Sequence, residues 1–390
     1  MPSPELQNAR PAVPAGEPAL SDATAEPALS DATVGQPAMA ATHAATDEPT
    51  NPAPAGGTAS ATQGATAAPT PAYEPMIDIL VPTYNGGRLW RESAHAIARC
   101  RVASEHLLDV MVVDSSSEDD SAKVGRHCGF RVYVIPPEEF DHGGTRNHAL
   151  DLCDPTPDIA VFLTQDAILA TPDAIDILVR VFRDPAVAVA YGRQLPHTNA
   201  NPIAAHARRF NYGTQGYIAS QADAPKRGLK TVFNSNSFAA YRVSALRELG
   251  GFPEKTILSE DMHLAARAVL AGYKVAYVPE ATAYHSHNYT ATEEFRRYFD
   301  IGVFHRDHPW INEKFGGAGG EGRRFLVSEL FYLLTRAPWW LPAAALHNLA
   351  KIVGYKLGKN YTRLPEKWRP AFSMNPRHWG AQRRPTKWWE

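Results

Sequence analysis

Short apolar runs alternate with polar clusters and helical segments between residues 76 and 300 of this 390-residue chain. Apolar positions recur at helical spacing in residues 89–103 and 262–271. Between them lie short apolar runs of strand length, at residues 77–81, 108–113, 131–135, 159–163, 238–241 and 274–278. Because strands and helices alternate, the pattern predicts an α/β domain with a mostly parallel sheet flanked by helices.

Polar clusters follow directly after three of these runs. In an open α/β sheet, ligands bind at the carboxyl ends of the strands, so the clusters are expected to converge on one site. The side chains predicted to face that site are Pro82, Tyr84, Asp114, Thr164, Gln165 and Asp166.

The chemistry of these clusters fits a nucleotide. Asp114, expected to be exposed at a strand end, can accept a hydrogen bond from the N–H of uracil or thymine, and Tyr84 can lie against the base. Arg146, which follows the paired glycines 143 and 144, can pair with a phosphate. Taken singly, an Asp after a strand is often a helix cap and two glycines are often an ordinary turn. Only the combination indicates a nucleotide diphosphate.

The first 75 residues have a different composition from the rest. They consist mainly of Ala, Pro, Thr, Gly and Ser with almost no large apolar side chain, so we predict a disordered tail over residues 1–75. This segment lacks the basic and apolar regions of a secretory signal. Cys100, Cys128 and Cys153 form neither a metal motif nor an even disulfide framework. Both observations favour a protein kept in the reducing cytoplasm with buried thiols.

Residues 301–390 form a third predicted region, a helical extension. Thirteen Lys and Arg against three acids lie between Arg323 and Glu390. Residues 323–334 and 343–357 are amphipathic, and no apolar stretch reaches bilayer length without a charge. Aromatic residues beside cations predict helices that lie on an anionic membrane, and the cations expected to face it are Arg323, Arg324, Lys351 and Lys356. The alternative is that these helices form the interface of a homodimer. We recognise no folded nucleic-acid-binding motif in the sequence, so a nucleic-acid role is not favoured.

Five motifs in order resemble the family 2 glycosyltransferases between residues 77 and 288. They begin at residues 82, 114, 140, 162 and 259, and read PTYN, DSSS, FDHGGTRN, FLTQDA and SED. With FNSNSFAAYR and YHSHNYT, they are most similar to bacterial rhamnosyltransferases that use dTDP-L-rhamnose. The resemblance implies a GT-A fold over residues 76–300 and inverting sugar transfer from a nucleotide sugar.

The resemblance also implies roles for individual residues. Asp261 is the expected general base and Glu260 a contact to the donor sugar. Asp166 is the expected ligand of Mg²⁺ or Mn²⁺, with His285 or His287 completing the metal shell or donating to a phosphate. A packed or solvated histidine remains an alternative at both positions.

Two further predictions concern hydrogen bonds to sugars. The family's metal motif is Asp-x-Asp, whereas this chain has Thr164, Gln165 and Asp166, so Thr164 or Gln165 is expected to contact the ribose. Asn234 and Asn236 lie in a run of small polar residues that suits an acceptor sugar, although a turn would explain the run equally well.

The predicted function is therefore transfer of a sugar, L-rhamnose by resemblance, to a glycan of a surface polysaccharide such as O-antigen. A polyprenyl-linked acceptor implies a peripheral protein on the cytoplasmic face of the inner membrane. Two alternatives stay open from the residues alone. One is a UDP-sugar donor, and the other is a non-catalytic nucleotide-sugar or glycan-binding module that has lost its metal site.

Overall fold

The computed structural model describes residues 74–316 and 319–381. The predicted tail lies outside this part of the chain, except for its last two residues, 74 and 75. No helix within the described ranges is both long and apolar enough to cross a bilayer.

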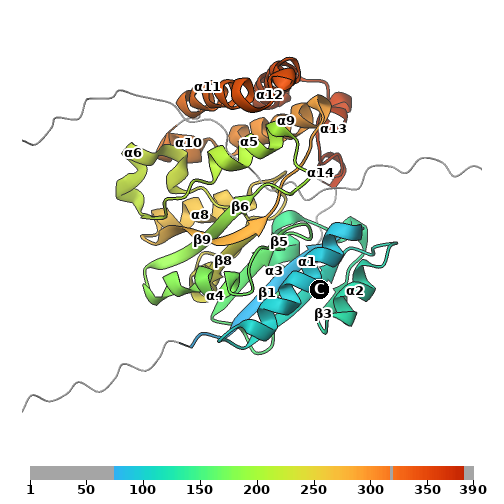
Figure 1. Cartoon of the computed structure of the whole chain (residues 1–390), viewed down its shortest axis with the longest axis vertical. Coiled ribbons are helices and arrows are strands. Elements are labelled where there is room, and N and C mark those ends of the chain that lie inside the picture. The colour runs from blue at the N-terminus through green and yellow to red at the C-terminus, as the bar shows by residue number, and fades with distance from the viewer. Residues whose placement is uncertain (1–73, 317–318, 382–390) are drawn as a thin grey trace, which may run out of the picture.

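A central sheet of nine strands organises the molecule, in the order β3-β2-β1-β4-β8-β6-β9-β5, with β7 paired to β9 (Figure 1). The strands are β1 (Ile77–Thr83), β2 (Leu108–Asp114), β3 (Arg131–Val134), β4 (Ile159–Leu163), β5 (Ile168–Leu169), β6 (Val187–Leu195), β7 (Tyr217–Ala219), β8 (Phe238–Arg242) and β9 (Lys274–Tyr284). The four strands β3, β2, β1 and β4 are parallel, and β8 is antiparallel to both β4 and β6. This mixed sheet confirms the predicted GT-A type of architecture.

Helices cover both faces of the sheet because successive strand residues point to opposite sides. In β1, Ile79 and Val81 pack on one face, whereas Leu80 packs on the other. The first face carries α1 (Gly87–Ala103), α2 (Ser121–His127) and α4 (Ala174–Val179). The second carries α3 (His142–Asp151), α7 (Val243–Glu248) and α8 (Glu260–Leu270).

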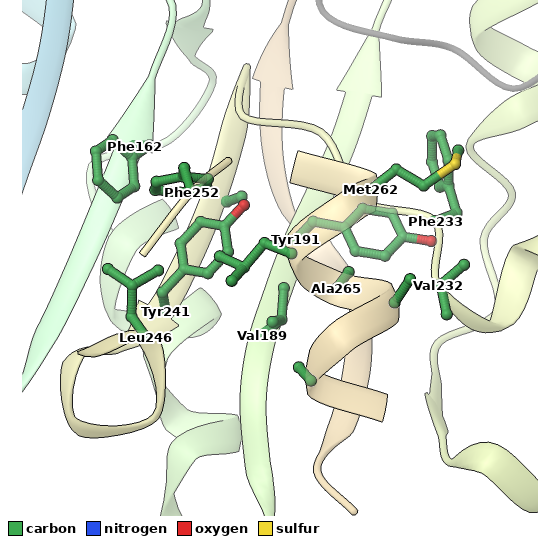
Figure 2. Close-up of a cluster of buried hydrophobic side chains, with 14 of the residues drawn as sticks. Phe162, Val189, Tyr191, Val232, Phe233, Tyr241, Leu246, Phe252, Met262 and Ala265 are labelled. Carbon is green, nitrogen blue, oxygen red and sulfur yellow. The ribbon is translucent and has the colours of Figure 1, made fainter. Parts of the chain in front are cut away.

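The core on the second face joins three strands to α8. Figure 2 shows Phe162 of β4 near Tyr241 of β8, and Tyr191 of β6 near Met262 of α8, all within one cluster. Phe162 meets the Tyr241 ring edge-on at 5.6 Å between centroids. These contacts fix α8 against the sheet, and the first turn of α8 carries Glu260 and Asp261.

The remaining helices form a layer beyond the second face (Figure 1). They are α5 (Pro202–Asn211), α6 (Ala224–Arg227), α9 (Ala291–Asp307), α10 (Pro309–Phe315), α11 (Gly319–Arg336), α12 (Leu341–Lys359), α13 (Arg369–Phe372) and α14 (His378–Ala381). α12 lies directly on α9 because glycines let the backbones meet. A Cβ at Gly354 or Gly358 would lie 2.3 Å or 2.0 Å from a carbonyl oxygen of α9.

The structure confirms the predicted strands, with ends that differ by up to six residues. The helices predicted at 89–103 and 262–271 also agree within two residues. Cys100, Cys128 and Cys153 are free thiols, of which Cys100 and Cys153 are buried. The apolar pattern missed β6, α5 and α9, which together support the site described below.

Candidate active site

The loops after β1 and β2 form one wall of the site. Asp114 ends β2 and is only 1% exposed. Its carboxylate accepts hydrogen bonds from the Thr83 hydroxyl at 2.8 Å and from the Ser117 backbone N–H at 2.8 Å. The expectation of an exposed Asp114 was therefore wrong, because neighbouring hydroxyl and amide groups enclose its oxygens. Pro82, Thr83 and Tyr84 line a pocket at this edge.

Gln165 joins the loop after β4 to the loop after β1. Its amide oxygen accepts from the Tyr84 N–H at 2.9 Å, and its amide nitrogen donates to the Tyr84 carbonyl at 3.1 Å. Thr164 is fully buried. Gln165 holds Tyr84 in place and also lines the pocket beside β1, so a ribose contact by Gln165 stays a prediction.

Asp166, His285 and His287 come together as predicted. Asp166 Oδ2 lies 3.4 Å from His285 Nε2 and 3.6 Å from His287 Nε2, and the two ring nitrogens are 3.1 Å apart. Burial disfavours the charged carboxylate, but the two imidazoles outweigh it and hold the pKa of Asp166 below its usual range. Burial also lowers the pKa of His287, which favours the neutral, metal-binding imidazole.

Partners on β6 and α5 orient this group. Gln194 Oε1 lies 2.8 Å from His285 Nδ1 and accepts a hydrogen bond from Arg208 at 2.5 Å. When Nδ1 donates to Gln194, Nε2 keeps its lone pair directed at Asp166 and His287. The three ligand atoms lie within 4.8 Å of one another, so the residues fit a divalent cation.

Glu260 and Asp261 lie side by side in the first turn of α8, and both are buried. Glu260 Oε1 lies 3.2 Å from Arg146 Nη1 and accepts from the Asn236 side-chain amide at 2.9 Å. Asp261 accepts from the backbone N–H of Asn236 at 3.0 Å. Ser259 just before them has φ 61°, a left-handed conformation that non-glycine residues rarely adopt.

The two carboxyls differ in charge state. Burial opposes ionisation of Glu260, but Arg146 and then His142 outweigh it and lower the pKa of Glu260. Burial first and the Glu260 charge second raise the pKa of Asp261 to about 7. The pair therefore holds one ionised carboxylate beside a carboxyl that can exchange a proton near neutral pH.

Arg146, Asn234 and Asn236 lie elsewhere than predicted. Arg146 is 1% exposed and contacts Glu260, and it also donates to the His142 carbonyl at 2.8 Å. Asn234 and Asn236 are fully buried and both contact the Tyr241 hydroxyl. Arg146 and Asn236 thus contact the carboxylate pair and Asn234 contacts Tyr241, and none of the three side chains is exposed for the predicted phosphate or acceptor contact.

Residues 234–237 join the two groups. Ser235 accepts a hydrogen bond from Gln194 at 2.9 Å, and Ser237 Oγ lies 3.5 Å from His285 Nε2. Asn236 meanwhile contacts Glu260 and Asp261. The metal-type group and the carboxylate pair are thus neighbours along one short segment. Sequence reasoning missed Gln194, for which no motif existed.

The site therefore combines a pocket beside β1, an Asp166, His285 and His287 group whose ligand atoms fit a divalent cation, and the buried pair Glu260 and Asp261. Residues 75–300 match the family described as "Glycosyltransferase like family 2". This chain belongs to the family 2 glycosyltransferases.

Two curated relatives match this glycosyltransferase over most of their length. It is 51% identical over 306 residues to the O-antigen chain rhamnosyltransferase WbaN of Salmonella anatum, covering 78% of this chain and 96% of the relative. It is equally 51% identical to RfbN of Salmonella typhimurium, an O-antigen chain rhamnosyltransferase, with the same coverage.

Among solved structures, the glycosyltransferase is similar to the mannosyltransferase PcManGT of Pyrobaculum calidifontis, in complex with GDP-Man and Mn²⁺. The match has 22% identity and a TM-score of 0.46, and it covers 81% of this chain and 88% of that protein.

Proposed function

We propose that this chain is an O-antigen chain rhamnosyltransferase that transfers L-rhamnose from dTDP-L-rhamnose to a lipid-linked glycan. The observation that carries the proposal is the 51% identity to two O-antigen chain rhamnosyltransferases across 78% of this chain. The buried carboxylate pair beside the metal-type group supplies the chemistry that such a transfer needs.

Asp261 is the proposed general base. Its two oxygens are oriented by the backbone N–H groups of Asn236 and Met262, and each keeps a further lone pair for the acceptor hydroxyl. As the acceptor oxygen bonds to the anomeric carbon, its proton moves to Asp261 and the bond from that carbon to the diphosphate breaks. Attack opposite the departing dTDP inverts the anomeric configuration.

Glu260 is proposed to remain ionised throughout. Its contact with Arg146 keeps a negative charge beside Asp261, and that charge makes Asp261 a stronger base. The same charge can stabilise positive character that develops on the sugar as the bond to the diphosphate breaks.

Asp166, His285 and His287 would hold the divalent cation. Two imidazoles with one carboxylate suit Mn²⁺ better than Mg²⁺, which prefers oxygen ligands and keeps its waters. When bound, the cation neutralises charge on the diphosphate leaving group. Gln194 fixes the His285 ring so that the site is formed before the donor arrives.

The membrane contact is proposed for α11 and α12. Arg323, Arg324 and Lys356 are exposed there, as the sequence predicted. Apolar side chains are exposed beside them, namely Leu326, Val327, Leu330, Phe331, Leu334, Trp339, Leu346, Leu349, Ile352 and Val353. An apolar surface flanked by cations fits an anionic leaflet on the cytoplasmic face, where a polyprenyl-linked acceptor would be presented.

Lys351 does not belong to this surface. Its ammonium lies 3.3 Å from Glu294 Oε1 of α9, and it is only 8% exposed. The expectation that Lys351 faces the membrane was wrong, because α12 turns that side chain toward α9.

A donor panel tests the proposed transfer. The full chain with Mn²⁺ should release dTDP from dTDP-L-rhamnose slowly without acceptor and faster with a lipid-linked acceptor, whereas UDP-sugars should give less product. Thermal shifts with Mg²⁺ and Mn²⁺ should rank the donors in the same order. Binding without any release of dTDP would favour a non-catalytic module, and faster turnover of a UDP-sugar would change the donor.

Vesicles test the membrane surface separately. The wild type should bind anionic vesicles at low salt and weaken as salt rises. The charge variant Arg323→Gln with Arg324→Gln and Lys356→Gln, and the apolar variant Phe331→Ser, should both bind less. If the wild type ignores such vesicles and forms dimers that Phe331→Ser disrupts, α11 and α12 are a homodimer face instead.

A further inference from the structure

The segment of residues 373–381 crosses from the helical layer back to the sheet. Asp300 of α9 is fully buried, and its Oδ2 accepts from the backbone N–H groups of Met374 at 2.8 Å and Asn375 at 3.3 Å. Trp379 packs on Tyr361 and Phe299, with ring centroids 5.4 Å and 6.2 Å apart. These contacts hold the segment between α13 and the N-terminal half of the sheet (Figure 1).

Arg377 reaches the pocket beside β1 from this segment. Its Nη1 donates to the Pro137 carbonyl at 3.3 Å, across 240 positions of sequence. It also lines the pocket formed by Pro82, Thr83, Tyr84, Ser115, Phe140 and Gln165. Among these lining residues, Arg377 alone carries a charged side chain.

A negatively charged ligand in this pocket would need a cation nearby. A nucleoside diphosphate brings negative charge into a site that already contains Asp114 and Asp166. Arg146, the cation expected for this task, is buried against Glu260. Arg377 remains exposed to solvent at the pocket, where its planar guanidinium can pair with a phosphate through two hydrogen bonds.

We propose that Arg377 binds a phosphate of the nucleotide-sugar donor, so that residues 373–381 form one wall of the donor site. The proposal rests on the proposed function, because it takes a nucleoside diphosphate sugar as the substrate. It assigns a donor-binding residue to the C-terminal helical region, which the family motifs do not reach.

Titration of the full chain with dTDP in the presence of Mn²⁺ tests the proposal. Arg377→Gln should weaken dTDP binding about tenfold, as expected for loss of a hydrogen bond to a charged group. Arg377→Lys should recover part of the loss, and the difference from wild type should shrink at high salt. Arg363→Gln removes the same charge from an exposed site in the same region, and it should bind like wild type.

Thermal unfolding without ligand separates binding from folding. The proposal predicts an unchanged midpoint for Arg377→Gln, because the side chain is exposed and makes one carbonyl contact. Wild-type dTDP affinity in Arg377→Gln, or a loss that Arg363→Gln shares, would overturn it. If the wild type binds UDP but not dTDP, the proposed donor fails, while weaker UDP binding by Arg377→Gln would still support the phosphate contact.

Discussion

The carboxylates of Asp166 and Asp261 belong to neighbouring parts of this site but have opposite surroundings. Asp166 faces two imidazoles, which hold its pKa low. Asp261 faces the carboxylate of Glu260, and burial together with that charge raises its pKa. Under the proposed function, these opposite surroundings suit Asp166 to hold a cation and Asp261 to accept a proton, although both residues are aspartates.

The largest expected effect comes from removing the proton acceptor. Asp261→Asn keeps the shape of the side chain but cannot take a proton, so transfer should fall by a factor of about 100 to 10,000. Steady-state transfer to acceptor with saturating donor measures this loss. A variant that keeps more than a tenth of wild-type turnover would place the base elsewhere, with Glu260 the next residue to test.

A smaller effect is expected from the orientation of His285. Gln194→Leu removes the partner of His285 Nδ1, and should weaken Mn²⁺ binding about 10-fold to 100-fold. Gln194→Glu keeps an acceptor for the same ring nitrogen and should retain most of the affinity. Calorimetric titration with Mn²⁺ compares the two, and equal losses in both would mean that Gln194 acts only through packing.

The pH dependence sharpens the contrast between the groups. Because burial and Glu260 raise the pKa of Asp261 to about 7, turnover should fall about tenfold per pH unit below that value and level off above it. Glu260→Gln removes the neighbouring negative charge and should move the midpoint to lower pH. A profile that does not shift in Glu260→Gln would show that the two carboxyls are not coupled as described.

The smallest effect is expected from deleting the N-terminal residues, which contain no residue of the site. Every residue assigned to the site falls within residues 82–377, so deleting residues 1–73 should leave donor turnover almost unchanged. Turnover of the shortened protein measures this directly, provided that its unfolding midpoint matches the full chain. A many-fold loss in a folded protein would reveal a further element in the deleted segment.

Sequence patterns predicted the elements best where local chemistry decides them. The strands β1, β2 and β4, each followed by a polar cluster, were found because an apolar run followed by a loop is visible within ten residues. The convergence of Asp166, His285 and His287 followed from their positions after strands. The helix α9 was missed, although Thr290 and Glu293 form a capping box that marks its start.

Long-range contacts explain the errors. Asn236 looks like a sugar contact in sequence, but its partner Glu260 lies 24 residues later, and the pairing buries both. Lys351 lies on an amphipathic helix, but its ammonium pairs with Glu294, 57 positions before it, so this side chain faces α9 and not solvent. Apolar spacing identifies a buried face without identifying its partner, so burial of polar residues required the tertiary structure.

Titration of dTDP into Asp166→Asn and Asp261→Asn with Mn²⁺ tests the division of work most directly. Asp261→Asn should bind dTDP as tightly as the wild type, because Asp261 acts on the acceptor proton. Asp166→Asn should bind dTDP more weakly, with partial recovery at higher Mn²⁺. Loss of dTDP binding in Asp261→Asn, or wild-type binding in Asp166→Asn, would contradict the separate roles of the two carboxylates.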